Sequence, residues 1–286
     1  MFPSGGLDRL WERNIQMGLI MSVIKSKRNL SDIQYIMDFR SLYDYTTRQL
    51  YKIPKRKQRW LGEPIINRMN KIESLLMEMS NEYFVYGINT KNKQERAKTI
   101  IKQLMKLQKP LIALWNIERY EQDEMIKWCE LINDLIRNVA VSHCLSYNDE
   151  IRYMFILDYS SIKRTEFMRN MSELHRLIYT HCISMPRNFR DTKGTRLMEL
   201  ADNALFYLSR ANIHIPKTKS QYENRRKDIS TALECINEMQ IPLFSVFNGL
   251  HYKNETMEQF AKMISYELKL LKGLLKSDEV RFSDIK

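Results

Sequence analysis

The chain has 286 residues, a hydrophobic fraction of 44%, and only 8 glycines and 7 prolines. This composition favours helices and excludes both a largely disordered chain and a β protein with many turns. The net charge of +12 indicates a polyanionic partner, which could be nucleic acid, an acidic membrane surface or an acidic protein. Because the positive charge is clustered rather than spread, we expect nucleic acid.

The N-terminal region lacks the features of a signal peptide or a membrane anchor. Charged residues precede the apolar run 15–24, no small-residue cleavage site follows it, and the run is too short to span a bilayer. Residues 7–24 instead predict an extra helix within an N-terminal extension of residues 1–30. We therefore expect no membrane partner. The four cysteines form no C-x-x-C pair and no short framework, which favours reduced thiols in a cytoplasmic protein.

Apolar residues at helical spacing predict four helices in residues 31–142. We expect them near residues 32–52, 63–84, 93–115 and 124–141. Pro64 suits the first turn of the second helix, whereas Pro110 lies inside the third helix and should kink it. Short connections between the four helices predict an antiparallel four-helix bundle.

The pattern of this first bundle recurs later in the chain at one constant offset and without a gap. Both internal prolines and the glycine after the first connection are repeated: Pro54 as Pro186, Gly62 as Gly194 and Pro110 as Pro242. The apolar stripes coincide at the same offset, so we predict an internal duplication. The second set of helices is expected near residues 163–184, 194–214, 221–247 and 255–276.

The predicted fold class is therefore all-α, with two tandem antiparallel four-helix bundles and an extra N-terminal helix. The first bundle is expected over residues 31–142 and the second over residues 163–278. The apolar linker between them, residues 143–162, should pack along the bundles, and residues 278–286 should form a frayed tail.

The sequence has no pattern typical of an enzyme. It contains no glycine-rich phosphate-binding loop and no His, Cys and Glu spacing typical of a zinc site. His175 and His181 do not share a helix face at their spacing, so we interpret them as ordinary polar or half-buried residues. We expect no catalytic residue, no metal ion and no cofactor.

The densest positive charge lies between the first two helices. Its cations are Lys52, Lys55, Arg56, Lys57 and Arg59, and Trp60 is adjacent to them. Cations beside an aromatic ring suit a phosphate backbone and a stacked base, although a solvated loop with Trp60 turned into the core is the alternative. In the second copy, the corresponding cations are Arg187, Arg190, Lys193 and Arg196, with Phe189 as the aromatic residue.

A second group of candidate nucleic-acid-binding residues lies on the third helix. These residues are Lys98, Lys102, Lys106 and Lys109, which line one face at helical spacing. Like charges stacked along a helix repel one another, so such a face favours a polyanion opposite it, with a solvated face as the alternative. The second copy is not basic at these positions.

Both copies carry a short motif between their first two helices. The second copy reads Met-Pro-Arg-Asn-Phe-Arg over residues 185–190, followed by Gly194, by Leu-Ser-Arg-Ala-Asn over residues 208–212, and by a third helix opening near Gln221. The first copy carries Pro54-Lys55 and Leu61-Gly62. This pattern resembles the accessory variability determinant family of diversity-generating retroelements, which is similar to four-helix-bundle proteins encoded in ribosomal-RNA intervening sequences. The first copy departs from the pattern at Gln58, and the second at Lys193.

The resemblance implies a non-catalytic accessory protein. Such a protein would bind a reverse transcriptase and its template RNA or the RNA–cDNA product, would support mutagenic cDNA synthesis, and could form a homo-oligomer. The alternative is a helical protein–protein interaction scaffold whose basic charge serves acidic partners or solubility.

Overall fold

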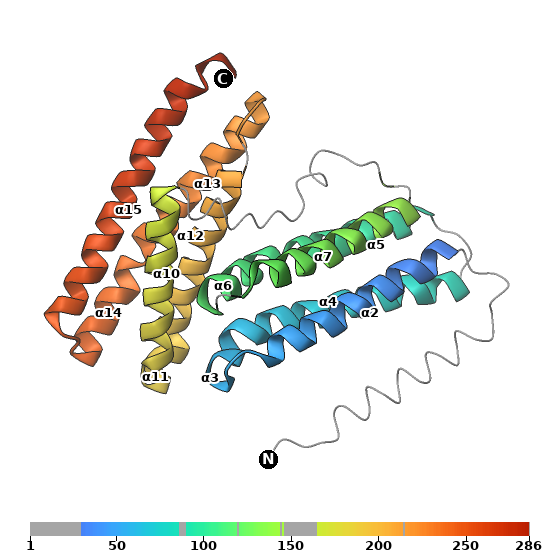
Figure 1. The fold of residues 1–286 in the computed structure, drawn as a ribbon, viewed down its shortest axis with the longest axis horizontal. Helices are drawn as coiled ribbons and strands as arrows, with labels where there is room; N and C mark the ends of the chain where they lie inside the picture. The colour runs from blue at the N-terminus through green and yellow to red at the C-terminus, as the bar shows by residue number, and fades with distance from the viewer. Residues whose placement is uncertain are drawn as a thin grey trace.

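A computed structural model describes residues 30–85, 90–118, 120–143, 145, 165–213 and 215–285 (Figure 1). Throughout these ranges the regular secondary structure is helical, with no strand. None of the described helices combines the length and the apolar character needed to cross a membrane. The helix expected in the N-terminal extension and most of the expected linker lie outside the described residues.

The first half of the molecule, residues 30–143, contains four long helical segments. In order, its elements are α2 (Leu30–Tyr51), α3 (Lys55–Lys57), the π-helix η2 (Gln58–Gly62), α4 (Glu63–Val85), α5 (Thr90–Met105), α6 (Gln108–Glu118) and α7 (Gln122–Ser142). Helix α2 packs on α4 and α7, and α5 also packs on both α4 and α7. Apolar side chains such as Leu42, Ile72, Leu104 and Ile132 are fully buried between these helices.

The second half, residues 165–285, has the same order of elements. These are α10 (Glu166–Ser184), α11 (Arg187–Phe189), the π-helix η3 (Arg190–Gly194), α12 (Thr195–Ile213), α13 (Lys219–Glu238), α14 (Gln240–Leu250), α15 (Asn254–Arg281) and the 3-10 helix η4 (Ser283–Ile285). Helix α12 packs on α10 and α13, and α15 also contacts both α10 and α13. The long helices of the two halves run in different directions (Figure 1).

The bounds of the elements recur at the offset that relates Pro54 to Pro186. At this offset, α3 coincides with α11, the π-helix η2 with η3, and α6 with α14, each at both ends, and the start of α7 coincides with the start of α15. An ion pair recurs with its charges exchanged: Glu78 pairs with Arg96 in the first half, and Arg210 pairs with Asp228 at the corresponding positions of the second. The two halves therefore share local geometry as well as sequence pattern.

The helix expected over residues 93–115 is interrupted, as its proline predicted. Helix α5 ends at Met105, and α6 begins at Gln108 after a turn. Pro110 is the third residue of α6, within the first turn, where the missing N–H removes no intrahelical hydrogen bond. Pro242 occupies the same place in α14, so both halves break their third helix at the same point.

The connections 54–62 and 186–194 are not the loops that we expected. Each forms one short α-helical turn followed by a π-helix, which continues directly into the next long helix. The Pro186 carbonyl accepts a hydrogen bond from the Arg190 backbone N–H at 2.9 Å, which closes the α-helical turn that precedes the wider π-helix. Neither Gly62 nor Gly194 has a positive φ, so backbone conformation does not require glycine at either position.

The frayed tail expected over residues 278–286 is also wrong for the part that the structure describes, residues 278–285. Helix α15 continues to Arg281, and the Asp278 carboxylate is buried against the Arg225 guanidinium, with a distance of 2.7 Å between Oδ2 and Nε. Arg225 also donates to the backbone carbonyl of Ala211. These contacts hold the last turns of α15 against α12 and α13.

Helix α6 joins the two halves. It contacts α4 and η2 in its own half, and α10 and α12 in the second half. The buried apolar residues of both halves form one contiguous core. The relative position of the two basic connections is therefore set by packed side chains.

Candidate nucleic-acid interface

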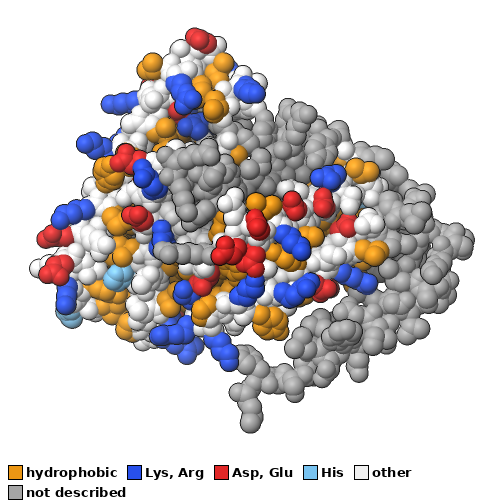
Figure 2. All heavy atoms as spheres, in the orientation of Figure 1, with side chains coloured by type: hydrophobic (Ala, Val, Ile, Leu, Met, Phe, Trp, Pro, Cys, Tyr) orange, Lys and Arg blue, Asp and Glu red, His pale blue; other side chains and the backbone are white. Residues whose placement is uncertain are grey.

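The fold brings the two basic connections together at one end of the molecule. Helices α3 and α11 lie at the same end of the structure, although they are far apart in the sequence (Figure 1). An ion pair joins the two segments, with 3.5 Å between Arg59 Nη1 and Asp191 Oδ1. Lys and Arg side chains gather at the lower edge of the surface in Figure 2, where Figure 1 places α3 and α11.

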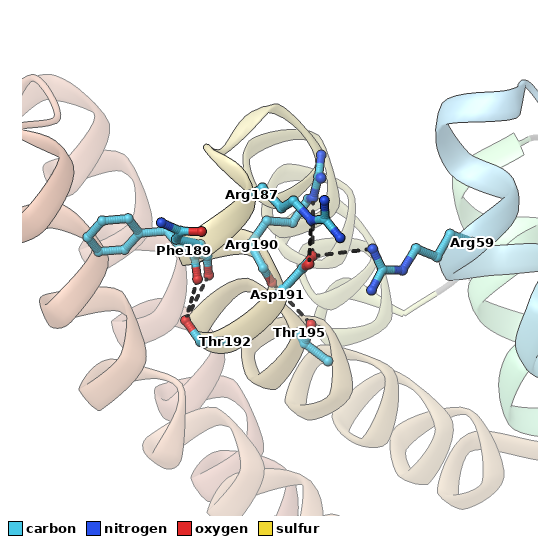
Figure 3. A network of polar contacts seen from close by, with 8 residues as sticks. Arg59, Arg187, Phe189, Arg190, Asp191, Thr192 and Thr195 are labelled. Atoms are coloured by element: carbon cyan, nitrogen blue, oxygen red, sulfur yellow. Dashed lines mark hydrogen bonds and ion pairs between the residues drawn. The ribbon is translucent and has the colours of Figure 1, made fainter.

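Three arginines surround the Asp191 carboxylate (Figure 3). Besides Arg59, Arg187 Nε lies 3.4 Å and Arg190 Nε 3.6 Å from its oxygens. One carboxylate balances only one of the three guanidinium charges, so an excess of positive charge remains. Guanidinium groups pair readily with phosphate oxygens, and each of these partly exposed pairs is weak enough to be exchanged for an external anion.

The predicted cations of the two connections differ in how far they are already neutralised. Lys57 Nζ lies 2.7 Å from Glu118 Oε1, and Lys52 pairs with Glu124. Lys55, Arg56 and Lys193 are exposed, and none of them forms an ion pair with any described residue. These three side chains, together with Arg187, whose side chain is 79% exposed, are therefore the predicted cations most accessible to a polyanion.

The aromatic residues of the two connections are not open stacking platforms. Arg59 lies over the Trp60 ring at 4.9 Å, and that ring is half-buried against the core. Phe189 points away from the arginines and lies against α14, where its ring leaves no space for a side chain on Gly249 (Figure 3). The geometry therefore favours phosphate contacts over base stacking at this end of the molecule.

The four lysines expected on one helix face are divided by the break before α6. Lys98 and Lys102 belong to α5, Lys106 lies in the turn, and Lys109 belongs to α6. Lys98 Nζ pairs with Glu95 Oε1 at 2.7 Å. Lys109 faces the second half, where its charge acts on the Cys235 thiol of α13 and opposes the rise in pKa that burial causes there. The continuous basic face expected from the sequence is therefore wrong.

Arg196 is also engaged within the protein. Its Nη2 lies 2.8 Å from Glu238 Oε2 on α13, and its Nη1 lies 3.6 Å from Glu199. Both pairs are well exposed and are therefore weak. Arg196 remains a possible phosphate contact, with Glu238 competing for it.

A buried polar network at the junction of the two halves was not predicted. The Asn116 amide of α6 donates to the Ser172 carbonyl of α10 at 3.0 Å, and its nitrogen lies 3.0 Å from His175 Nδ1. The other ring nitrogen, Nε2, lies 2.9 Å from Asp202 Oδ1. Because the Asn116 amide nitrogen can only donate, Nδ1 accepts its hydrogen bond, and Nε2–H donates to Asp202. The His175 side chain, expected to be an ordinary polar or half-buried one, is 0% exposed.

Metal-ligating and nucleophilic side chains were compared among the described residues of the fold. No group of three or more His, Cys, Asp or Glu side chains within them could hold a metal ion. Burial raises the pKa of the Cys182 thiol to about 12, which keeps it protonated and unreactive at neutral pH. An apolar hollow beside Cys182 and His181 has a volume of about 10 Å³, enough for one water molecule.

Comparison with known proteins does not assign the chain to a family. No family model, no curated protein and no solved structure matches the chain. The candidate interface is therefore interpreted from its own residues.

Proposed function

We propose that the chain is a tandem pair of antiparallel four-helix bundles that binds RNA without catalysing a reaction. The observation that carries this proposal is the meeting of the two basic connections at one end of the molecule, where Arg59 of the first half pairs with Asp191 of the second. Two copies of one basic connection, placed side by side, offer a wider positive surface than either could alone.

Binding would act mainly through phosphates. Lys55, Arg56 and Lys193 are free to contact the backbone of the nucleic acid, and Arg187 and Arg190 can exchange Asp191 for a phosphate. Contacts of this kind give affinity with little sequence preference, because every nucleotide presents the same phosphate. The half-buried Trp60 and the inward-facing Phe189 are consistent with this mode.

The partner that we propose is a reverse transcriptase with its template RNA or RNA–cDNA product. This part of the proposal rests on the resemblance to the accessory variability determinant family. Support comes from the position of the motif, since each half places its proline, its cations and its glycine between its first two long helices. The protein would act in the cytoplasm and support mutagenic cDNA synthesis. A reverse transcriptase gene beside a template and variable repeat pair in the same locus would support this role.

Charge reversal at the free cations tests RNA binding. A variant carrying both Lys55→Glu and Arg56→Glu should bind a fluorescently labelled single-stranded RNA at least about tenfold more weakly, measured by anisotropy at fixed salt. The control carries Lys272→Glu and Lys276→Glu, two exposed positions on α15 that undergo the same change in charge. Equal loss of affinity in the two variants would show that only net charge matters, and would contradict a site at the connections.

A protein-interaction scaffold is the second candidate, and one observation favours it. Lys52, Lys57 and Arg59 are already paired with acidic residues of the protein, so much of the local charge serves the fold. A scaffold purified at low salt should carry no nucleic acid, and its ratio of absorbance at 260 nm to that at 280 nm should be that of protein alone. An RNA-binding protein should retain nucleic acid under the same conditions, and nuclease treatment should lower the ratio.

A further inference from the structure

Helix α6 is buried on all of its sides. The consecutive residues 111–116 are all buried, and Ile112 is only 2% exposed. A helix within a single bundle buries one face and leaves the other to solvent. Helix α6 differs because its inner face packs within the first half, while its outer face lies against α10 and α12 of the second. Its outer face is thus an internal docking surface.

Helix α14 occupies the corresponding place in the second half, but only one of its faces is buried. Its buried residues are Pro242, Leu243, Val246 and Phe247, and its substantial contacts are with α12, α13 and η3 of the same half. Phe244, which corresponds to Ile112, is 64% exposed, and the neighbouring Ile241 is 73% exposed. Two large apolar side chains one turn apart on an uncovered helix face are typical of an interaction surface.

The surface that receives α6 also has an equivalent, on α2 and α4 of the first half. In the second half, the Asn116 amide meets His175, which is paired with Asp202. The corresponding residues of the first half are Tyr43 and Asn70, whose hydroxyl and amide oxygen lie 3.0 Å apart. A hydrogen-bonded polar pair is therefore present at this place in both halves. In the second half helix α6 covers the pair, whereas in the first half no described helix covers it.

Apolar residues that share helix faces with these polar pairs also correspond: Met168 is seven residues before His175, and Met198 is four residues before Asp202. Met168 and Met198 are fully or nearly fully buried in the second half. At the equivalent positions of the first half, Ile36 and Ile66 are only partly buried. The first half thus presents a receiving surface of similar pattern, and a helix docked on it would bury the remaining exposed area of Ile36 and Ile66.

The charges at the edge of the junction would also be complementary if the same contact formed between two molecules. Arg59 and Asp191 occupy corresponding positions, and they pair across the junction within one chain. If the second half docked onto the first half of another molecule, Asp191 would face Arg59 of that molecule. The charges would again be opposite, so the alternation of sign along successive halves favours this order of assembly.

We propose that a second copy of this chain docks its α2 and α4 surface onto the outer face of α14, which repeats the internal junction between molecules. The contact is head-to-tail, because a different surface of each molecule takes part. Such contacts continue until they close into a ring or extend as a filament. This inference rests on the correspondence of the two halves and does not require RNA binding.

Sedimentation velocity of the full chain, free of nucleic acid, measures this assembly. The wild-type mass should rise with concentration above the 34.4 kDa of one chain. Phe244→Asp should weaken self-association at least about tenfold, because it places a charge at the centre of the contact. Val280→Asp is the matched control, since Val280 is 78% exposed on α15, away from both surfaces. Circular dichroism checks that each variant keeps its helical content.

A mixing experiment separates head-to-tail docking from other contacts. Phe244→Asp blocks the α14 face, and Asn70→Arg blocks the receiving face at an exposed position. Each variant keeps one intact surface, so an equimolar mixture should form dimers and nothing larger. A wild type that stays at the mass of one chain, an unaffected Phe244→Asp variant, or a mixture that does not associate would each overturn the proposal.

Discussion

Glu267 provides a direct test of how the second half is packed. Its side chain is 0% exposed on α15, and Oε2 accepts a hydrogen bond from the Asn170 amide at 2.7 Å, while Oε1 has no hydrogen-bond partner. Burial raises the pKa of this carboxyl from 4.5 to about 8, although the Asn170 hydrogen bond acts in the opposite direction. The first half has Leu135 at the corresponding position, also fully buried.

The raised pKa sets the direction of the pH dependence. Between pH 4.5 and 8 the folded protein holds a proton on Glu267 that the unfolded chain has released. The stability that comes from this proton is fully present below pH 4.5 and is lost as the pH rises towards 8. Between pH 5 and pH 7.5 the loss should be about 3 kcal/mol, since each pH unit in this window costs at most about 1.4 kcal/mol.

Glu267→Gln isolates this contribution, because the amide keeps the shape and an acceptor for Asn170 but does not titrate. The free energy of unfolding, measured in urea by circular dichroism at 222 nm, should fall less with rising pH in the variant than in the wild type. The difference between the two proteins should change by about 3 kcal/mol over pH 5 to 7.5. Glu223→Gln, at an exposed position on α13, is the control. Parallel pH profiles for wild type and Glu267→Gln would refute the reasoning.

Three further substitutions test packing in the second half. Gly249→Ala should destabilise by about 1–3 kcal/mol, because its Cβ would lie 2.5 Å from Cζ of Phe189. Gly273→Ala, with nothing within 4 Å of its Cβ, should instead stabilise by up to about 1 kcal/mol in the same urea titration. Asp278→Ala should cost about 3–5 kcal/mol, because it leaves the Arg225 guanidinium buried without its carboxylate. A thermal midpoint unchanged by Asp278→Ala would show that the end of α15 does not depend on this pair.

Helix positions could be predicted from the sequence to a large extent. The apolar periodicity located each long helix of the described residues, and Pro110 and Pro242 marked the breaks in the third helix of each half. The π-helices could not be predicted, because Gln58–Gly62 and Arg190–Gly194 carry glycine and charge that are equally typical of a loop. The end of α15 was placed too early because its partner, Arg225, lies 53 residues away in the sequence.

The candidate interface was less predictable, because neutralisation of a charge depends on distant residues. Lys57 looks free in the sequence, yet Glu118 pairs with it from α6. Asp191 is a single acid in a basic run, and only the fold shows that it links the two halves through Arg59. The junction at Asn116 and His175 was missed because it depends on contacts between the halves, about which the periodicity of one helix carries no information.

The salt dependence of RNA binding tests the central claim most directly. If Lys55, Arg56, Lys193 and the arginines around Asp191 contact phosphates, the logarithm of the association constant should fall linearly with the logarithm of salt concentration. Reversing Lys55 and Arg56 should make that slope shallower by about 1–2, whereas reversing Lys272 and Lys276 should leave it unchanged. An affinity independent of salt, or equal slopes for all three proteins, would contradict binding at the two connections.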